Sequence, residues 1–379
     1  MAMDITLATP LLGGLSPQAF MRRHWQKKPL LIRQALPDPM PPLARSELFA
    51  LAAREGVESR LVERRAAGWT LRHGPFTRRQ LPPLNQAAWT LLVQGVDLHV
   101  DATHDLLARF RFAPEARLDD LMISYATDGG GVGPHFDSYD VFLLQVQGQR
   151  RWRVGRMADA TLQADVPLKI LAAFEPEQEF VLTPGDMLYL PPRWAHDGVA
   201  VGECMTCSIG FRAPHRTEAG REVLQRLLDD EDAPSTDTLY RDPSQTATSA
   251  PGRIPAALQA FAIDAVARLV GDPDALGRAL GEWLSEPKPS VCFDGGAACV
   301  AGAGIRLDRR TRMLYDDHHV FINGESFRAG GRDATLMRRL ADRRGLQPDE
   351  VRRLSKPAAR LLDDWACAGW LHSREEGTR

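Results

Sequence analysis

Residues 118 to 213 alternate between short apolar runs and turn-forming residues. Gly, Pro and Asp interrupt the runs at a spacing typical of antiparallel strands. The runs are LDDLMISYA, VFLLQVQG, RWRVG, EFVL, DMLYLP and ECMTCSIGF. We interpret VFLLQVQG and RWRVG as two strands joined by a hairpin turn at Gly148-Gln149. The pattern predicts an antiparallel sandwich or barrel over this region.

The segment before this region mixes helical and strand patterns. MRRHWQKKPLLIR reads as the end of a helix followed by a short strand, and SRLVERRAAGWTLRHGPF reads as a hairpin. NQAAWTLLVQGVDLHVDATHDLLARF has the apolar spacing of a long helix. We therefore expect a helix-containing lead-in from residue 1 to about 115.

Helical periodicity returns after the β region. Three segments have the apolar spacing of helices, namely HRTEAGREVLQRLLDDED, IPAALQAFAIDAVARLV and DALGRALGEWLS. Between the first and the second lies the polar segment APSTDTLYRDPSQTATSAPGR, which resembles a linker. GIRLDRRTRMLYDDHHVFINGESFR then predicts two or three strands with a turn at Asn323-Gly324. Two further helices, DATLMRRLADRRGL and KPAARLLDDWACAGWL, complete the pattern of a winged helix.

These patterns predict an α+β protein with three parts. A barrel domain is expected in residues 1–215, with its core at about 118–213, followed by a helical segment in 216–290 and a winged-helix-like domain in 291–379. A chain of 379 residues, 44% hydrophobic and 25% charged, is long enough for two or three such domains.

Composition narrows the class of protein. The net charge is −2, and residues 301 to 379 hold 16 Lys and Arg against 12 Asp and Glu, so direct nucleic-acid binding is not expected. No apolar run is long enough to cross a membrane, and the amino terminus lacks the basic region of a signal peptide. Five cysteines favour a reducing, cytoplasmic location, and Cys204 and Cys207 are expected to be structural.

Two His-x-Asp pairs are candidate metal ligands, His99-Val-Asp101 and His135-Phe-Asp137. On a strand, residues two apart project on the same face, whereas on a helix they diverge. His99 lies in the predicted helix, so we reject that pair. His135 follows Gly133-Pro134 and precedes a strong β run, so its pair is suited to chelation.

A third ligand is expected from His196. It is the only other histidine between residues 118 and 213, and it follows the strand DMLYLP near the start of the next one. A double-stranded β-helix (cupin) barrel brings such a distal histidine to the same mouth as the first pair. Two imidazoles and one carboxylate form the facial triad of non-haem Fe(II) oxygenases.

An iron site of this kind would use 2-oxoglutarate only if a buried cation held the distal carboxylate. Arg150, Arg151 and Arg153 begin the strand after the predicted turn. Alternation places Arg151 and Arg153 on one face and Arg150 on the other, with Trp152. Periodicity alone does not say which face is inside.

With these motifs in place, the chain resembles the bacterial JmjC-type ribosomal oxygenases over its first 215 residues. The motifs that carry the resemblance are HWQKKPLLIR (24–33), SRLV (59–62), HGPF (73–76), DDLMISY (119–125), GGGVGPHFDSYDVF (129–142), RRWRVG (150–155), PGDMLYLPP (184–192) and SIGFRAP (208–214). The resemblance implies a JmjC barrel, a helical dimerisation segment and a winged helix. It also implies Fe(II), 2-oxoglutarate as cosubstrate, O₂, and hydroxylation of an arginine β-carbon in a large-subunit ribosomal protein by a homodimer.

The resemblance also implies roles for individual residues. His135, Asp137 and His196 are the iron ligands, whereas Arg150 and Ser124 bind 2-oxoglutarate. If Ser124 faces the barrel interior, Asp120 and Met122 share that face, because all three are spaced by two. We then expect Asp120 to pair with a substrate guanidinium, Met122 to pack on its aliphatic stem and Tyr139 to stack on it.

Two alternatives remain. The same chemistry on another side chain would make the protein a histidyl or lysyl hydroxylase or a demethylase, since lysine would also pair with Asp120. A metal-binding cupin joined to a winged helix would instead make a transcription regulator.

Overall fold

The computed structural model describes residues 4–37, 39–157, 159–229, 238–247, 249–300, 302–328 and 330–374. The chain divides into two compact units, the first of Met1–Ala213 with Pro289–Cys292 and the second of Pro214–Lys288 with Phe293–Arg379. The domain boundaries expected at residues 215 and 290 stay predictions. None of the described helices is long and apolar enough to cross a membrane.

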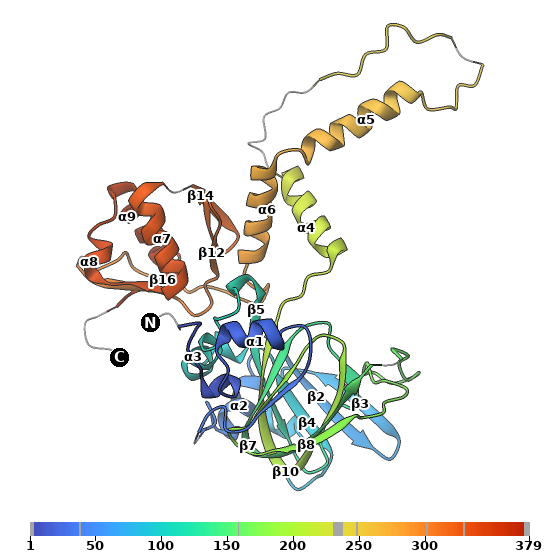
Figure 1. Cartoon of the computed structure of the whole chain (residues 1–379), viewed down its shortest axis with the longest axis vertical. Coiled ribbons are helices and arrows are strands. Elements are labelled where there is room, and N and C mark those ends of the chain that lie inside the picture. Colours follow the sequence, from blue (N-terminus) through green and yellow to red (C-terminus); the bar gives the residue numbers. More distant parts are fainter. Residues whose placement is uncertain are drawn as a thin grey trace. The chain divides into compact units, whose positions relative to one another are not determined.

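The first unit is built on an antiparallel sheet of ten strands that curves round to enclose a barrel (Figure 1). Eight strands follow one another across the sheet in the order β1 (Leu30–Ile32), β9 (Met187–Leu190), β7 (Val141–Arg156), β10 (Trp194–Phe211), β5 (Leu118–Ala126), β4 (Trp89–Val93), β2 (Ser59–Arg65) and β3 (Gly68–His73). β6 (His135–Phe136) pairs with β10, and β8 (Gln178–Leu182) pairs with β7. The antiparallel barrel, the early hairpin and the strand after the first helix are all as predicted.

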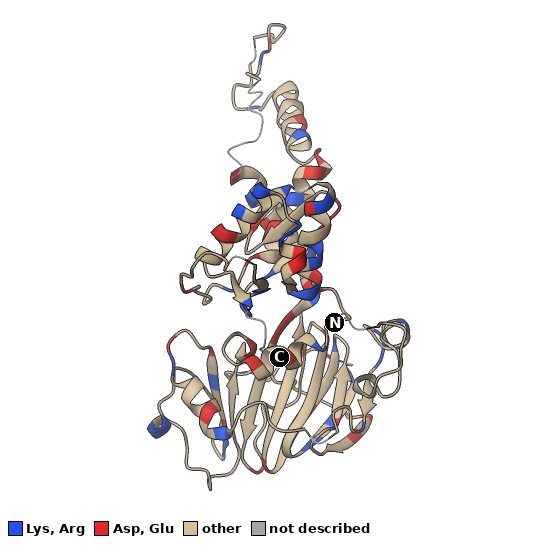
Figure 2. Cartoon of the chain, turned by 90° about the vertical axis from the view of Figure 1, so that its left-hand side faces the viewer, with Lys and Arg blue, Asp and Glu red and all other residues tan. Residues whose placement is uncertain are grey.

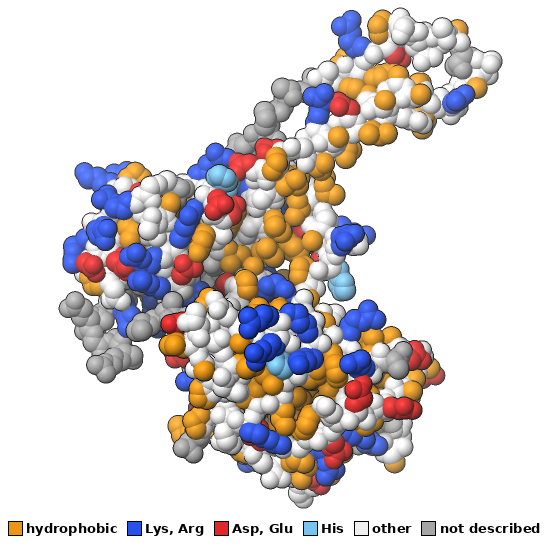
Figure 3. Space-filling model, viewed as in Figure 1, with side chains coloured by type: hydrophobic (Ala, Val, Ile, Leu, Met, Phe, Trp, Pro, Cys, Tyr) orange, Lys and Arg blue, Asp and Glu red, His pale blue; other side chains and the backbone are white. Residues whose placement is uncertain are grey.

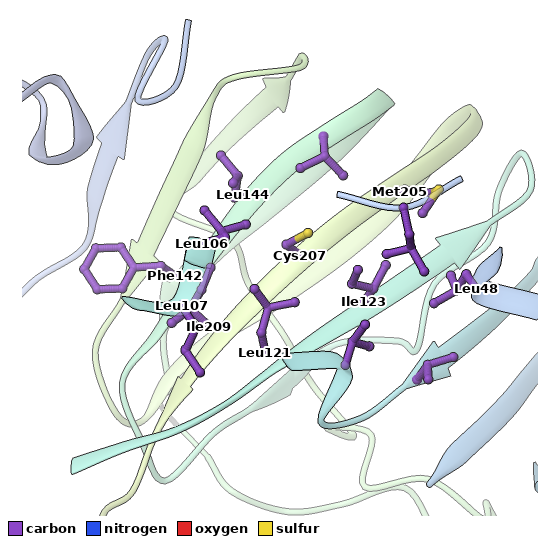
Figure 4. Packing of buried hydrophobic residues seen from close by; sticks show 14 of the residues in the cluster. Leu48, Leu106, Leu107, Leu121, Ile123, Phe142, Leu144, Met205, Cys207 and Ile209 are labelled. Carbon is purple, nitrogen blue, oxygen red and sulfur yellow. The ribbon is translucent and has the colours of Figure 1, made fainter. Parts of the chain in front are cut away.

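Three short helices belong to this unit and contribute to the core on the outer face of the sheet. They are α1 (Pro17–Arg23), α2 (Arg45–Ala52) and α3 (Asp101–Ala108). Their buried side chains pack against every second residue of β5, β7 and β10 (Figure 4). The labelled residues in that view are Leu48, Leu106, Leu107, Leu121, Ile123, Phe142, Leu144, Met205, Cys207 and Ile209.

This packing assigns the faces of β5. Leu121 and Ile123 lie in the outer core, so the alternate residues Asp120, Met122 and Ser124 face the barrel interior. The same alternation separates the two cysteines of β10. Cys207 joins the outer core, whereas Cys204 packs with Ala126 and Ala200, and both are buried free thiols, as expected for structural cysteines.

The long helix predicted over residues 85–110 is wrong in its first half. That segment forms strand β4, then a 3-10 turn at Val96–Leu98, and only then α3. The run WTLLV is buried at every position between β2 and β5, and a strand covered on both faces loses the alternation that distinguishes it from a helix. His99 ends the 3-10 turn, so the helical reason for rejecting it as a ligand does not hold.

The hairpin predicted at Gly148-Gln149 is also wrong, because β7 runs through it as one strand of 16 residues. The turn-like residues mark a bulge, since the register with β10 shifts between Thr206↔Gln145, Met205↔Gln147 and Val201↔Gln149. Gly148 has a φ of 63°, and a Cβ on it would lie 2.1 Å from the carbonyl oxygen of Glu203. Only glycine fits this conformation and this approach.

The bulge reverses the alternation along β7. Before it, odd-numbered residues such as Leu143 face the interior; after it, even-numbered Trp152 and Val154 pack in the same cluster as Leu143. Arg150 therefore faces the interior with Trp152, whereas Arg151 and Arg153 face outward.

The second unit begins with helices α4 (Arg216–Asp229), α5 (Ala256–Leu269) and α6 (Pro273–Ser285), as predicted. Part of the expected linker at 233–253, and the end of the predicted helix HRTEAGREVLQRLLDDED, lie outside the described residues. The remainder holds two three-stranded sheets and three helices, namely β11 (Gly304–Leu307), β12 (Met313–Tyr315), β13 (His319–Ile322), β14 (Glu325–Arg328), α7 (Gly331–Arg343), β15 (Gly345–Leu346), α8 (Pro348–Val351), α9 (Lys356–Cys367) and β16 (Leu371–Arg374).

Four strands thus stand where two or three were expected between residues 304 and 328. The Asn323-Gly324 turn is confirmed, because both residues have positive φ, 49° and 92°, between β13 and β14. Apolar residues of the sheets, α7 and α9 form a separate core. Acidic and basic residues are interspersed along the helices of this unit (Figure 2), in keeping with its small charge excess.

Candidate metal and cosubstrate site

His135, Asp137 and His196 meet at one end of the barrel interior. His135 and His196 are directly paired residues of β6 and β10, with ring centroids 4.3 Å apart. Nε2 of His196 lies 3.7 Å from Oδ2 of Asp137, and one ligand atom from each of the three residues lies within 4.8 Å of the others. Across the described parts of the chain, no other group of three or more His, Cys, Asp and Glu side chains meets this criterion.

Backbone contacts orient both imidazoles. Nδ1 of His135 lies 3.0 Å from the carbonyl oxygen of Gly133, and Nδ1 of His196 lies 3.0 Å from that of Trp194. A carbonyl can only accept, so Nδ1 carries the proton on each ring and Nε2 is left with its lone pair. This is the arrangement that metal-binding histidines adopt.

Electrostatics also favour a neutral ligand at His196. Burial and the neighbouring His135 lower the pKa of His196 to about 4. The ring is therefore uncharged near neutral pH, as metal binding requires. Two imidazoles beside one carboxylate fit Fe(II) in a facial triad.

The glycines before His135 allow the chain to approach this site closely. A Cβ on Gly131 would lie 2.6 Å from the carbonyl oxygen of Gly198 on β10, and a Cβ on Gly133 would lie 2.8 Å from the side chain of Ile170. Gly133 also has a positive φ of 80°. The glycine run thus lets this segment lie directly on β10, next to the short strand β6 that carries His135.

Arg150 provides a buried cation inside the same barrel. It is 5% exposed, and its terminal Nη2 lies 3.6 Å from Sγ of Cys204. Its Nε has no hydrogen-bond partner among the described residues. Arg151 and Arg153 face outward and pair with Glu179 and Asp197. A buried guanidinium without an internal carboxylate is costly unless an anionic ligand pairs with it, so Arg150 fits a carboxylate anchor.

The remaining predicted residues line the interior beside these groups. Ser124 is buried, and its hydroxyl donates to the carbonyl oxygen of Thr206 at 3.4 Å. Met122 is partly buried and Tyr139 is 39% exposed. Removal from water and the Asp137 carboxylate raise the pKa of Tyr139. The Asp120 carboxylate raises this pKa further, whereas the Arg60 guanidinium lowers it.

Sequence analysis missed two residues at this end of the barrel, Arg60 and Gln94. Gln94 donates to both oxygens of Asp120, at 3.1 and 2.9 Å, and its Oε1 accepts from Arg60. Arg60 belongs to β2, and Gln94 follows β4. No local motif marks either one, and the predicted helix across β4 concealed the strand that positions Gln94.

Comparison with known proteins places this geometry in a family. A JmjC domain model matches residues 105–219, and a ROXA-like winged-helix model matches residues 268–372. The chain is 34% identical over 336 residues to the ribosomal protein uL16 3-hydroxylase of Escherichia coli, covering 83% of this chain and 86% of that protein. It is 38% identical over 206 residues to a probable ribosomal oxygenase of Haemophilus influenzae, covering 53% and 50% of the two chains.

Solved structures agree in fold. The X-ray structure of E. coli YcfD superposes with a TM-score of 0.85 at 28% identity and covers 99% of this chain and 100% of that one. The E. coli ribosomal oxygenase YcfD in complex with cobalt and 2-oxoglutarate superposes with a TM-score of 0.80 at 29% identity, covering 95% and 99%. Because the match to the E. coli hydroxylase covers most of both chains, this chain belongs to the JmjC-type ribosomal oxygenases.

Proposed function

We propose that this protein is an Fe(II)- and 2-oxoglutarate-dependent oxygenase that hydroxylates the β-carbon of an arginine in a large-subunit ribosomal protein. The observation that carries the proposal is the joint presence of the His135, Asp137 and His196 cluster and the buried Arg150 inside one barrel. A metal triad alone would fit several classes of enzyme, but an interior cation with no acidic partner in the described parts of the chain favours a dicarboxylate cosubstrate.

His135, Asp137 and His196 would hold the iron. When bound, iron, 2-oxoglutarate and O₂ together supply oxidation of an unactivated C–H bond, with succinate and CO₂ as co-products. A facial set of three protein ligands leaves room for both the cosubstrate and O₂. Cobalt and 2-oxoglutarate are bound together in a YcfD structure, which supports the same pair of sites here.

Arg150 and Ser124 would orient the cosubstrate. The guanidinium of Arg150 would present N–H donors to the distal carboxylate. The Ser124 hydroxyl, which donates to the carbonyl oxygen of Thr206 in this structure, would rotate away from that 3.4 Å contact to add a further donor. Both groups are buried, so each contact forms away from water, where a charge-assisted hydrogen bond is stronger. The protein thereby fixes the direction from which the cosubstrate reaches the metal.

The substrate side is formed by Asp120, Met122 and Tyr139. A carboxylate beside a thioether and an aromatic ring suits a long cationic side chain, whose stem packs on Met122 and Tyr139 while its head group pairs with Asp120. The E. coli relative is named a uL16 3-hydroxylase, and carbon 3 of an amino acid is its β-carbon. That name supports a ribosomal substrate and the position of hydroxylation. A ribosomal substrate also favours the predicted cytoplasmic location.

Mass spectrometry of ribosomal proteins tests the proposal directly. We expect an arginine of one large-subunit protein to carry about +16 Da in cells with the gene, and the unmodified mass in cells without it. If the same mass were added to a histidine or a lysine instead, the protein would be a histidyl or lysyl hydroxylase. No difference in any ribosomal protein would refute the ribosomal substrate.

The chemistry is tested separately with purified protein. His196→Ala removes one of two imidazole ligands, so we expect loss of Fe(II)-dependent 2-oxoglutarate turnover in an assay that needs no peptide. His99→Ala is the matched control, because His99 lies outside the metal cluster. Normal turnover by His196→Ala would show that the triad is wrong. Absence of turnover by the wild-type protein would instead favour the non-catalytic regulator alternative.

A further inference from the structure

Three polar side chains form a row across the barrel interior. Ser124 on β5, Thr206 on β10 and Gln145 on β7 are directly opposite one another in the register of these strands. All three are buried, and Gln145 is 0% exposed. The proposed function uses Ser124 at one end of the row but gives no role to Gln145 at the other. A fully buried amide finds its hydrogen-bond partners inside the protein, so its contacts show what it supports.

Gln145 spans the bulge of β7 from the inside. Its Nε2 donates to the carbonyl oxygen of Gln147 at 2.8 Å and to that of Gly148 at 3.4 Å. Both carbonyls belong to the segment in which the register with β10 shifts. An amide nitrogen carries two hydrogens, so these two bonds use both of its donors. The side chain therefore bridges the bulge that turns Arg150 into the barrel.

The other end of the same amide bonds to Thr206. Its Oε1 accepts a hydrogen bond from the Thr206 hydroxyl at 2.9 Å. Because carbonyls only accept, the amide nitrogen must face the bulge and the amide oxygen must face Thr206, which leaves one orientation that satisfies every partner. Thr206 in turn lies directly opposite Ser124, and its backbone carbonyl accepts from the Ser124 hydroxyl in this structure. One side chain is thus connected to Arg150 through the bulge and to Ser124 through Thr206.

We propose that Gln145 is a positioning residue for 2-oxoglutarate, which keeps Arg150 turned into the barrel and Thr206 fixed beside Ser124. The inference rests on the proposed function. Because its donors are already used by the two bulge carbonyls, Gln145 acts through these residues and not on the cosubstrate itself.

The bulge needs such a bridge because glycine permits a conformation without fixing it. Gly148 can adopt the positive φ of the bulge, but it is equally free to leave it. A shift of the register by one residue would turn Arg150 outward, since alternate residues of a strand face opposite sides. The bonds from Gln145 to the carbonyls of Gln147 and Gly148 hold the bulge in the register that serves the cosubstrate.

Loss of the bridge should appear as a loss of 2-oxoglutarate affinity. The apparent Kd of a ligand rises in inverse proportion to the fraction of protein in the binding conformation. If Arg150 stays inside for about a tenth of the time, the Kd should rise about tenfold. The affinity for Fe(II) should not follow, because His135 lies on β6 and His196 near the start of β10, whereas Thr206 lies toward the other end of that strand.

The test uses the full-length protein in the absence of O₂. Calorimetric titration measures the Kd for Fe(II) with metal-free protein and the Kd for 2-oxoglutarate with Fe(II)-loaded protein. Gln145→Met keeps the length of the side chain but neither donates to the bulge nor accepts from Thr206. We expect this variant to raise the Kd for 2-oxoglutarate about tenfold and to change the Kd for Fe(II) less than about twofold.

Variants of Thr206 test the other end of the amide. Thr206→Val removes the hydroxyl donor, so we expect a smaller rise in the Kd for 2-oxoglutarate, about threefold. Thr206→Ser keeps the donor and should retain the wild-type value. The matched control is Thr103→Val, because Thr103 is also buried and donates to a carbonyl, that of Val100, but lies on α3 outside the barrel. It should leave both Kd values unchanged.

An unchanged Kd for 2-oxoglutarate in Gln145→Met and Thr206→Val would refute the positioning role and leave the proposed function intact. Equal weakening of Fe(II) and 2-oxoglutarate binding in both variants would show general support of the fold, and would refute the role as well. Thr206→Val is the milder change and decides the question if Gln145→Met does not fold. A wild-type protein that bound Fe(II) but no 2-oxoglutarate would overturn both this inference and the proposed function.

Discussion

Arg150 and Arg151 are neighbours in sequence with opposite environments. Arg150 is 5% exposed, and its Nε lacks a hydrogen-bond partner within the part of the chain that the structure describes. The side chain of Arg151 is 50% exposed and pairs with Glu179. We expect Arg150→Met to raise the KM for 2-oxoglutarate by about 100-fold, because a buried charge-assisted pair contributes roughly 3 kcal/mol. Steady-state 2-oxoglutarate turnover measures this.

Arg151→Met is the control for that prediction and should change the same KM less than about twofold, because exposed ion pairs contribute little. A similar rise in both variants would indicate general damage to β7. No rise in Arg150→Met would place the cosubstrate anchor elsewhere.

His196 predicts how stability depends on pH in the metal-free protein. Its folded-state pKa of about 4 lies below the ordinary imidazole value of about 6.5, so the folded state binds protons less readily than the unfolded state. The free energy of unfolding should therefore be fully retained above about pH 6.5 and should fall as the pH drops toward about 4. Urea unfolding at a series of pH values, with chelator present, measures the change.

His196→Gln removes the titrating ring and should flatten part of this dependence. If the variant lost as much stability as the wild type between about pH 7 and pH 5, the buried neutral histidine would not be its source.

At the scale of elements, the bulge in β7 decides which side chains enter the barrel. Gly148 combines a φ of 63° with a carbonyl 2.1 Å from where a Cβ would lie, whereas Gly202 has a φ of 71° with nothing within 4 Å. Gly202→Ala should cost about 1 kcal/mol of unfolding free energy from backbone strain alone. Gly148→Ala adds steric overlap with Glu203, and we expect a further loss of about 1–3 kcal/mol.

Chemical denaturation of the two variants measures the difference. If Gly148→Ala cost no more than Gly202→Ala, the close approach at the bulge would not be a constraint. Should Gly148→Ala fold but shift register, Arg150 would leave the interior, and 2-oxoglutarate affinity would fall with it.

At the scale of the whole molecule, the second unit exposes an apolar surface on its helices. Figure 3 shows hydrophobic side chains along α4, α5 and α6. The larger exposed ones are Leu224, Leu228, Leu258, Ile263, Val266 and Leu280. We propose that a second copy of the chain covers them, as the family resemblance implies for a dimerisation segment.

Ile263→Asp tests the dimer. Ile263 is 70% exposed, so a charge there should barely affect the fold of one chain but should oppose association across an apolar interface. Light scattering after size exclusion should give the mass of a dimer for the wild type and a smaller mass for the variant. The control is Arg268→Ala on the same helix, which removes only an exposed ion pair with Asp264. A wild-type mass of one chain would refute the homodimer.

The sequence alone predicted the residues of the candidate metal site and determined most of the fold. His135, Asp137 and His196 were predictable because strand alternation and the spacing of turn residues are local properties, and a facial triad needs only a few residues of known type. The winged-helix pattern followed from periodicity in the same way. Local patterns also explain the wrong predictions at β4 and at position 148. The fully buried strand β4 lacks alternation, and glycine at position 148 satisfies the requirements of both a turn and a bulge.

The tertiary structure decided what depends on register and on contacts between distant segments. Alternation left open whether Arg150 or the pair Arg151 and Arg153 entered the barrel, and the bulge resolved it by reversing the faces of β7. Gln94 contacts Asp120, which lies 26 positions further along the chain, and Arg60 contacts Gln94, 34 positions further along. Such contacts arise only when β2, β4 and β5 lie side by side, because side chains from β2, from β5 and from the residue after β4 then converge on one point that no single segment encodes.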